Sequence, residues 1–314
     1  MITVRAIASY VPEGFEDNYA QAARFGLGRD FIAEKIGVER VSRRAEGEET
    51  SDMCVRAFEA LKTSADITTE KIDFLMVVTQ NPDGGGLPQS SAVIHNKLNL
   101  SPDCASFDLS LACSGYVYGL SVATSFMEAN GLKNGLLFTC DPYSKIIDPE
   151  DKGTALLFGD AATVTHLAEG AGPKGSWRPH DFKFSTYGRH MDDVKVVDGH
   201  LNMDGVAIVI FTAGTVPGEV HKVLSGAGLT MEDIDLFLFH QGSKFIIDSL
   251  SKRLGAPHEK IPMHIAQQGN TVSSSIPLML ETYLEDKAHN RLLLNGCGVG
   301  LSMGTCLITR IEPE

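Results

Sequence analysis

Cys113 is the residue of this chain with the clearest potential for chemistry. It lies in a run of apolar and small residues, 107–116, and apolar residues at helical spacing follow it as far as Gly131. A cysteine before a helix N-terminus meets free backbone N–H groups and the positive end of the helix dipole. These favour the reactive thiolate and can hold an oxyanion. We therefore expect Cys113 to accept an acyl group, although a free cysteine is usually a small buried hydrophobic residue.

Two further polar residues stand where α/β proteins place functional groups. His240 directly follows the apolar run 236–239 and precedes a turn of small residues. Asn270 lies between a glycine and a threonine, just before a helix-like stretch. Alone, His240 could be a satisfied buried histidine and Asn270 a turn or N-cap residue. With Cys113 they would supply a nucleophile and two hydrogen-bonding groups.

The elements that must position these residues form a pattern that occurs twice. Segments 68–78 and 230–239 resemble each other, and each follows a helix-like stretch and runs into a continuous apolar strand. We therefore expect two similar α/β halves that arose by duplication. The helix-like stretches are 53–61 and 216–224, and the later expected strands are 135–140 and 154–159 in the first half and 291–295 and 304–308 in the second.

The expected organisation has three parts. Residues 1–170 form an N-terminal half that carries Cys113, and residues 206–314 form a C-terminal half that carries His240 and Asn270. Residues 171–205 begin with a turn-rich segment and show no clear apolar period, which predicts a loop-rich connection covering the site.

Composition excludes several classes of protein. The 314 residues include 27 Lys and Arg against 40 Asp and Glu, a net charge of −13 that argues against nucleic acid as a partner. The six cysteines form no CxxC pair, which indicates neither a zinc site nor a disulfide framework and favours a reducing cytoplasm. We expect no secretory signal and no apolar run long enough to span a bilayer.

An acidic partner would need a local basic patch on so acidic a chain. Lys244, Lys252 and Arg253 surround the apolar helix-like stretch 245–250 and are candidates for docking a carrier protein. An ordinary solvated helix face explains them equally well.

Taken together, these segments resemble the β-ketoacyl-acyl carrier protein synthase III family of the thiolase-like superfamily. The resemblance covers nearly the whole chain. It implies an α/β, thiolase-like fold: two duplicated βαβαβαββ halves packed as a five-layered α-β-α-β-α sandwich. It also implies a cytoplasmic homodimer that works with acyl carrier protein. The segments that carry it are 36–40, 107–115, 148–162, 240–242, 269–271 and 295–304.

The resemblance also implies roles for individual residues. Cys113 would take an acyl group from a thioester donor. His240 and Asn270 would bind the thioester carbonyl of a malonyl extender while it loses carbon dioxide, because a neutral donor pair stabilises an enolate. The backbone N–H groups of Cys113 and Val299 would form the oxyanion hole. The reaction would need no cofactor or metal, only acyl-coenzyme A or carrier-protein thioesters as substrates.

Several positions depart from the family pattern. Phe31 replaces a tryptophan, and Lys35 and Lys152 replace arginines that grip coenzyme A. Lysine lacks the planar, bidentate phosphate contacts of arginine, so we expect weak use of acyl-coenzyme A and a preference for a carrier-bound donor. Ser243 replaces the family's asparagine after the histidine motif, where the residue is structural, and stays a candidate contact of the substrate.

A loop at 81–88 is a further departure. In the family this loop crosses a dimer interface and its tip lines the acyl pocket of the other subunit. Leu87 stands where the tip is often aromatic, and three glycines precede it. We therefore expect a pocket that takes more than acetyl.

Two other interpretations stay open. Cys113 could pass its acyl group to a hydroxyl or amine of a small molecule, with His240 as general base. The chain could also be a silent partner subunit, although its three intact residues argue against this. The altered grip on coenzyme A favours a specialised fatty acid or polyketide-like pathway over housekeeping initiation.

Overall fold

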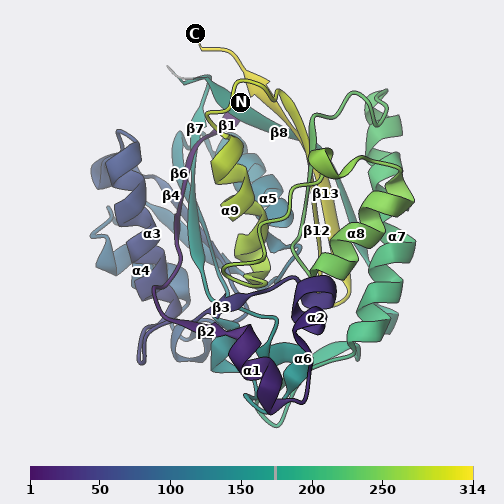
Figure 1. Cartoon of the computed structure of the whole chain (residues 1–314). Helices are drawn as coiled ribbons and strands as arrows, with labels where there is room; N and C mark the ends of the chain where they lie inside the picture. The colour runs from purple at the N-terminus through teal and green to yellow at the C-terminus, as the bar shows by residue number, and fades with distance from the viewer. Residues whose placement is uncertain (173–174, 314) are drawn as a thin grey trace.

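Nine strands run side by side through the structure, a computed structural model that describes residues 1–172 and 175–313 (Figure 1). Their order is β11-β12-β13-β8-β1-β7-β6-β4-β5. Strands β1 and β8 meet in the middle and pair only where Val4 lies opposite Trp177, so this narrow seam joins two sheets. The strands are β1 (Ile2–Tyr10), β4 (Phe74–Val78), β5 (Ala105–Leu109), β6 (Asn134–Cys140), β7 (Ala162–Glu169), β8 (Ser176–Thr186), β11 (Leu236–Phe239), β12 (Arg291–Gly298) and β13 (Ser302–Ile311).

Helices cover both sheets and fill the space between them. Helices α3 (Thr50–Ser64) and α4 (Ser90–Lys97) pack on the N-terminal sheet. Helices α5 (Gly115–Asn130) and α9 (Ser275–Tyr283) lie between the two sheets, and α7 (Gly205–Ala227) and α8 (Lys244–Leu254) form the other outer layer (Figure 1). The predicted five-layered α-β-α-β-α sandwich is therefore confirmed.

Small elements surround the lower end of the sandwich in Figure 1, where the carboxyl ends of β1, β4, β6 and β12 lie. They complete the list of secondary structure that is relevant to the site: β2 (Phe15–Asp17), β3 (Arg40–Ser42), β9 (Val194–Val197), β10 (His200–Met203), α1 (Asn18–Arg24), α2 (Arg29–Phe31) and α6 (Lys152–Ala155).

The predicted duplication is visible in matching contacts. β4 and β11 occupy equivalent places, and an aspartate precedes each of them. The Asp73 carboxylate accepts hydrogen bonds from the backbone at the start of β6, and the Asp235 carboxylate does the same for β12. The halves are not identical, because in the described part of the second half no strand corresponds to β5. The chain between α8 and α9 is irregular there.

One predicted strand is wrong. Residues 154–159 are apolar enough for a strand, but Asp151 caps helix α6 by accepting hydrogen bonds from Gly153 N and Thr154 Oγ1. After this short helix the chain turns, and Gly159 N donates to Asn270 O at 3.0 Å. The strand of this region is β7, which begins three residues later, at Ala162.

The expectation of a loop-rich connection over 171–205 is also wrong for most of its length. The segment contains β8, a central strand of eleven residues, and the β9–β10 hairpin. Buried Trp177 alternates with exposed Arg178 along β8, so the sequence shows no continuous apolar run. Val194 and Met203 of the hairpin and Gly205 at the end of the segment line the cavity described below; Pro173 and Lys174 lie outside the described residues.

Helix α7 corrects a further expectation. By length and composition it could cross a membrane, the one such helix within residues 1–172 and 175–313. However, Phe211, Val216 and Val220 are buried against the second sheet, and α7 also contacts α8. A helix that packs against a sheet can be as long and as apolar as a membrane-spanning helix. Packing in the sandwich therefore explains the apolar composition of α7.

Candidate active site

Cys113 lies in the short turn between β5 and α5, as the sequence predicts. Its neighbour Ser114 is the N-cap of α5, and Gly115 N donates to Ala112 O at 2.7 Å to close the turn. The Ser114 hydroxyl lies 2.7 Å from the Ser302 hydroxyl on β13. The turn that carries the thiol is thus tied to the second half of the chain.

Two glycines of β12 explain how closely the halves approach at this point. A Cβ atom on Gly298 would lie 2.8 Å from the Cβ atom of Cys113, and one on Gly296 would lie 2.6 Å from the Cys113 carbonyl oxygen. No side chain fits in either place without displacing the thiol. The glycine-rich segment therefore packs directly against Cys113, and its next residue, Val299, lines the same cavity.

His240 directly follows β11 and is buried. Its backbone N–H donates to Asn295 O, and ring atom Nδ1 lies 2.7 Å from the hydroxyl oxygen of Ser275. Burial lowers the pKa of His240 from 6.5 to about 4, so the ring is neutral at physiological pH. With Nδ1 engaged by Ser275, Nε2 is the ring nitrogen left for a substrate.

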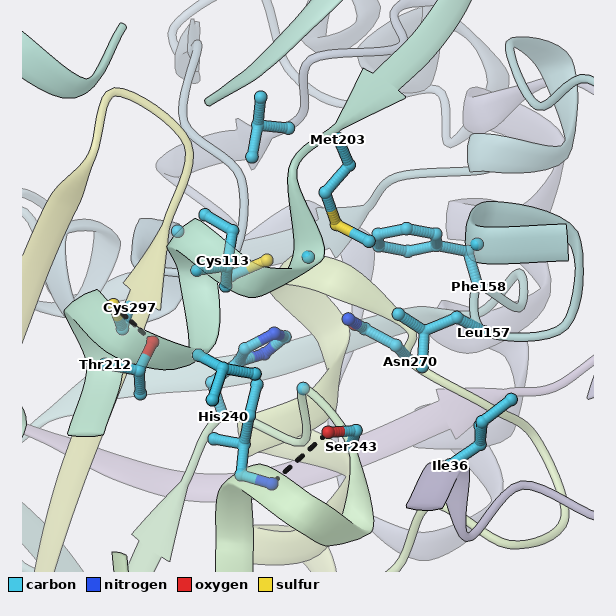
Figure 2. A pocket seen from close by; sticks show the side chains of 18 of the residues that line it. Ile36, Cys113, Leu157, Phe158, Met203, Thr212, His240, Ser243, Asn270 and Cys297 are labelled. Carbon is cyan, nitrogen blue, oxygen red and sulfur yellow. Dashed lines mark hydrogen bonds between the residues drawn. The ribbon is translucent and has the colours of Figure 1, made fainter. Parts of the chain in front are cut away.

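Asn270 is buried, and its backbone is held by the segment 154–159, which the sequence predicts as a strand. Its backbone N–H donates to Leu157 O, and its carbonyl accepts from Gly159 N. Side-chain atom Oδ1 accepts from Val272 N at 2.9 Å. The amide nitrogen, Nδ2, is then the free end, and Figure 2 shows it directed towards Cys113 and His240.

Cys113, His240 and Asn270 line one cavity of about 320 Å³ (Figure 2). Most of its wall is apolar, so hydrogen-bond donors inside it act at a low local dielectric. The chain thus places a thiol, a neutral imidazole and an amide around one space, as the sequence predicts.

One expectation about Cys113 is wrong for the resting protein. The helix N-terminus was expected to favour the thiolate. Instead, burial and, to a lesser degree, the Asp141 carboxylate raise the pKa of Cys113 well above that of a free thiol. The helix dipole falls off within a turn and is smaller than the loss of hydration of a buried anion.

The residues expected to contact the substrate arm lie at the mouth of the cavity. Phe31, Lys35, Lys152 and Ser243 all line it, and the Phe31 ring is 39% exposed. The Lys35 ammonium lies 5.3 Å from the ring centroid of Phe245. The mouth is therefore aromatic and basic, without an arginine among its lining residues.

The predicted docking residues do not gather into one patch. Lys244 is half-buried and paired with Asp248 at 2.9 Å and with Glu34 at 3.6 Å. Lys252 and Arg253 are exposed in the last turn of α8, about 12 Å along the helix from Lys244. Only these last two remain free to receive an acidic partner.

Leu87 does not line the cavity of its own chain. It is 90% exposed at the tip of the 81–88 loop, where Gly84 and Gly85 have left-handed backbone conformations. This exposure leaves the side chain available to a second subunit.

The sequence did not single out several residues of the site. Ser275 positions His240. Cys297 and Thr212 lie on the wall of the cavity, and Tyr143 donates to Gln80 beside it. The run of three serines, 273–275, was the one signal for Ser275. Cys297 lies in the segment 295–304 that carries the resemblance but was given no role, and nothing in the local sequence marks Thr212 or Tyr143.

Comparison with known proteins identifies relatives over nearly the whole chain. The family model for 3-oxoacyl-[acyl-carrier-protein] synthase III matches residues 107–188, and the model for its C-terminal part matches residues 224–310. The β-ketoacyl-[acyl-carrier-protein] synthase III of Acidiphilium cryptum is 31% identical, over 97% of this chain and 98% of its own. That of Streptococcus pneumoniae is 30% identical over 98% of both chains.

Solved structures agree with this result. A 3-oxoacyl-(acyl-carrier-protein) synthase from Burkholderia xenovorans is 31% identical with a TM-score of 0.90, covering 99% of this chain and 94% of its own. OleA from Xanthomonas campestris, at 17% identity, covers 98% of this chain and 96% of its own with a TM-score of 0.87, a likeness of fold alone. At least 97% of this chain is thus covered by relatives named as β-ketoacyl- or 3-oxoacyl-acyl carrier protein synthases.

Proposed function

The chain belongs to the β-ketoacyl-acyl carrier protein synthase III family, and we propose that it forms carbon–carbon bonds between two thioesters. Cys113 takes an acyl group from one thioester. The acyl-cysteine then condenses with a malonyl-type thioester on acyl carrier protein, with loss of carbon dioxide, to give a β-ketoacyl product. No cofactor is needed in this scheme, because both substrates are already activated as thioesters.

The arrangement of two neutral donors beside the thiol is the observation that carries this proposal. Nε2 of His240 and Nδ2 of Asn270 are the two donors that the proposal assigns to a substrate beside Cys113, in a cavity with a mostly apolar wall. Decarboxylation places a negative charge on the thioester oxygen of the extender. Two fixed donors stabilise this charge more than they stabilise the neutral carbonyl, which lowers the barrier.

In the proposed sequence, Cys113 attacks the donor thioester, and the leaving thiolate takes the proton of the cysteine. The bond between carbon 2 of the extender and its carboxylate then breaks, which releases carbon dioxide. The resulting enolate carbon attacks the acyl-cysteine. The backbone N–H groups of Cys113 and Val299 would hold the oxyanion of each tetrahedral intermediate. The cysteine leaves as a thiolate and is protonated again.

Transfer of the acyl group to a hydroxyl or amine is less well supported. In that reaction His240 would act as general base, which requires a pKa near the working pH. Burial lowers the pKa of His240 to about 4, so the ring is a weak base but a sound neutral donor. The same property thus favours condensation over simple transfer.

We also propose that the donor arrives on a carrier protein. Phe31 and Lys35 at the mouth offer stacking and a point charge, but no bidentate phosphate contact. Exposed Lys252 and Arg253 would receive the acidic carrier at a distance from the mouth. Reduced use of free acyl-coenzyme A would suit a specialised fatty acid or polyketide-like pathway in the cytoplasm.

A homodimer is part of the proposal. Strand β5 lies at the edge of the sheet, and exposed edges usually receive a partner or a cover. Leu87 is 90% exposed and would reach the acyl pocket of the other subunit, where an aliphatic tip leaves room for more than acetyl. Light scattering should give twice the 33.9 kDa mass of the chain.

Intact-protein mass spectrometry with carbon dioxide detection tests the function. The wild type and Cys113→Ala are each offered acyl carriers and acyl-coenzyme A esters of several chain lengths, with and without malonyl carrier protein. We expect acylation of the wild type alone, followed by carbon dioxide release and a β-ketoacyl carrier. Acylation followed by transfer to a small alcohol or amine, without carbon dioxide, would support the alternative. A wild type that is acylated only when another subunit is added would indicate a silent partner subunit.

A further inference from the structure

From its mouth, the cavity also runs between α7 and α8. Along α7 it is lined by Gly205, Ile208 and Thr212, and along α8 by the N-cap Ser243 and by Ile246 and Leu250. These residues recur at helical spacing over seven residues of each helix, which corresponds to a depth of about 10 Å. The deep part is lined by Ile208, Thr212, Phe239, Ile246, Leu250 and Cys297, and is called the α7/α8 lobe below.

The alternation along β12 places the lobe on one side of the sheet. Gly296 and Gly298 face the turn of Cys113, whereas Cys297 between them faces α7. Its small side chain leaves open the space that a larger residue would fill. Figure 2 shows Thr212 and Cys297 on one side of Cys113 and His240, with Phe158 and Met203 on the other.

The lobe suits an alkyl group and not a polar one. Its two polar groups, the Thr212 hydroxyl and the Cys297 thiol, lie 3.8 Å apart and engage each other. The remaining walls are aliphatic or aromatic. The amides of a pantetheine arm would lose their hydrogen bonds to water there without replacement, which is costly. An alkyl chain would instead gain from burial.

The position of the lobe indicates which substrate carries that chain. It opens beside His240, which in the proposed function binds the carbonyl of the second thioester. The opposite side of the cavity, with Tyr143 and Phe158 in contact at a ring distance of 5.1 Å, is left for the acyl group on Cys113. A substituent on the extender carbon next to that carbonyl would then point into the lobe.

Resting on the proposed condensation, we propose that the α7/α8 lobe binds an alkyl group on the extender, so that 2-alkylmalonyl thioesters are substrates. The bond between carbon 2 of the 2-alkylmalonyl unit and its carboxylate breaks, which releases carbon dioxide. The resulting enolate carbon bonds to the acyl carbon, and the bond from that carbon to Cys113 Sγ breaks. One proton is taken up by the released thiolate. The product is a 2-alkyl-3-oxoacyl carrier.

Competition between extenders tests this. The wild type and Cys297→Phe receive malonyl, methylmalonyl, ethylmalonyl and butylmalonyl carriers with one acyl donor, and the products are measured by mass spectrometry. We expect the wild type to use the alkylated extenders. Filling the lobe should lower their kcat/KM relative to malonyl by about tenfold or more, because one methylene in an apolar pocket changes kcat/KM by roughly 10- to 200-fold.

Two further variants make the test specific. Thr212→Leu fills the lobe from the opposite wall and should act like Cys297→Phe, even if one of the two folds poorly. Ile210→Phe adds similar bulk on the exposed face of α7, where Ile210 is 68% exposed, and should leave the extender ratio as in the wild type. Thermal unfolding of each variant separates loss of fold from loss of selectivity.

The other outcomes would overturn the proposal in distinguishable ways. If the filling variants shorten the range of acyl donors and leave the extender ratio unchanged, the lobe holds the donor chain. If the wild type condenses malonyl but no alkylated extender, the lobe proposal fails and the condensation stands. If no extender releases carbon dioxide, the proposed function fails. Calorimetric binding of butylmalonyl-pantetheine, tighter to the wild type than to Cys297→Phe, would then still support the lobe, and equal binding would exclude it.

Discussion

Nδ1 of His240 lies 2.7 Å from the hydroxyl oxygen of Ser275, the first residue of α9. The same oxygen accepts the backbone N–H of Gln241 at 3.5 Å. The proposed mechanism requires Nδ1 to accept the hydroxyl proton, because the ring proton then sits on Nε2 and can be donated to a substrate oxygen. Ser275 is thus a positioning residue in the proposed mechanism.

Replacing Ser275 tests this relationship. Ser275→Ala should lower kcat for condensation about fivefold with little change in KM, since one neutral hydrogen bond contributes about 1 kcal/mol. Alanine favours a helix, so α9 should remain folded. Ser275→Thr keeps the hydroxyl and should restore most of the rate. Equal losses in both variants would point to a packing role.

His240 and Asn270 should separate the two half-reactions. His240→Ala and Asn270→Ala should each retain acylation of Cys113 but lower carbon dioxide release from malonyl carrier by about 10²- to 10³-fold, the effect of losing one oxyanion donor. The double variant should lose less than the product of the two, because the donors act on one oxygen. Acylation that fails in both variants would instead assign them to the first step.

The resting thiol should be neutral. Because burial and Asp141 raise the pKa of Cys113 well above its usual range, its reaction with iodoacetamide should rise about tenfold per pH unit and still be rising at pH 9. Asp141→Asn removes a nearby negative charge and should increase the rate above about pH 6, where Asp141 is ionised. A rate that levels off near pH 7 would mean that the helix N-terminus outweighs burial.

Stability should fall on the acid side of neutrality. Burial lowers the pKa of His240 and His166 from 6.5 to about 4 and raises that of Asp141 from 3.8 to about 6. Below pH 6.5 the unfolded chain takes up two histidine protons that the folded chain excludes, while folded Asp141 binds one that the unfolded chain lacks. The net difference of one proton predicts a loss of about 1.4 kcal/mol per pH unit towards pH 5.

Denaturant unfolding between pH 5 and 7 measures that slope. Asp141→Asn removes the opposing carboxylate, so the unfolded variant should bind about two protons more than the folded one. Its free energy of unfolding should therefore fall about twice as steeply towards pH 5 as that of the wild type. His166→Gln, which cannot be protonated, should lose stability less steeply. Identical slopes in all three proteins would contradict the assignment of these groups.

Residues at the mouth of the cavity should determine whether acyl-coenzyme A or an acyl carrier serves as the acyl donor. Phe31→Trp combined with Lys35→Arg should raise kcat/KM for acyl-coenzyme A, since indole stacking and a bidentate guanidinium strengthen the grip on the nucleotide. Use of acyl carrier should change little. Reversing charge at Lys252 and Arg253 should weaken only carrier substrates, and less so at high salt. Efficient acylation of the wild type by micromolar acetyl-coenzyme A would contradict the carrier preference.

Much of the fold and of the candidate site could be predicted from the sequence. The buried strands β4 and β11, the helix after Cys113, and the grouping of Cys113 with His240 and Asn270 could all be predicted. Each rests on a local pattern: an apolar run, a helical period, or a polar residue at the end of a strand. The segment 154–159 could not, because an N-cap at Asp151 and a hydrogen bond to Asn270 outweighed its apolar composition.

The sequence by itself determined the family, the duplicated α/β order and the residues with the chemistry to react. Only the tertiary structure decided how those residues behave. Burial of Cys113 and His240 sets their protonation, because hydration is lost only when all layers pack together. The orientation of His240 by Ser275 and the lobe beside Cys297 arise from contacts between elements distant in the chain. No local pattern of residues encodes such contacts.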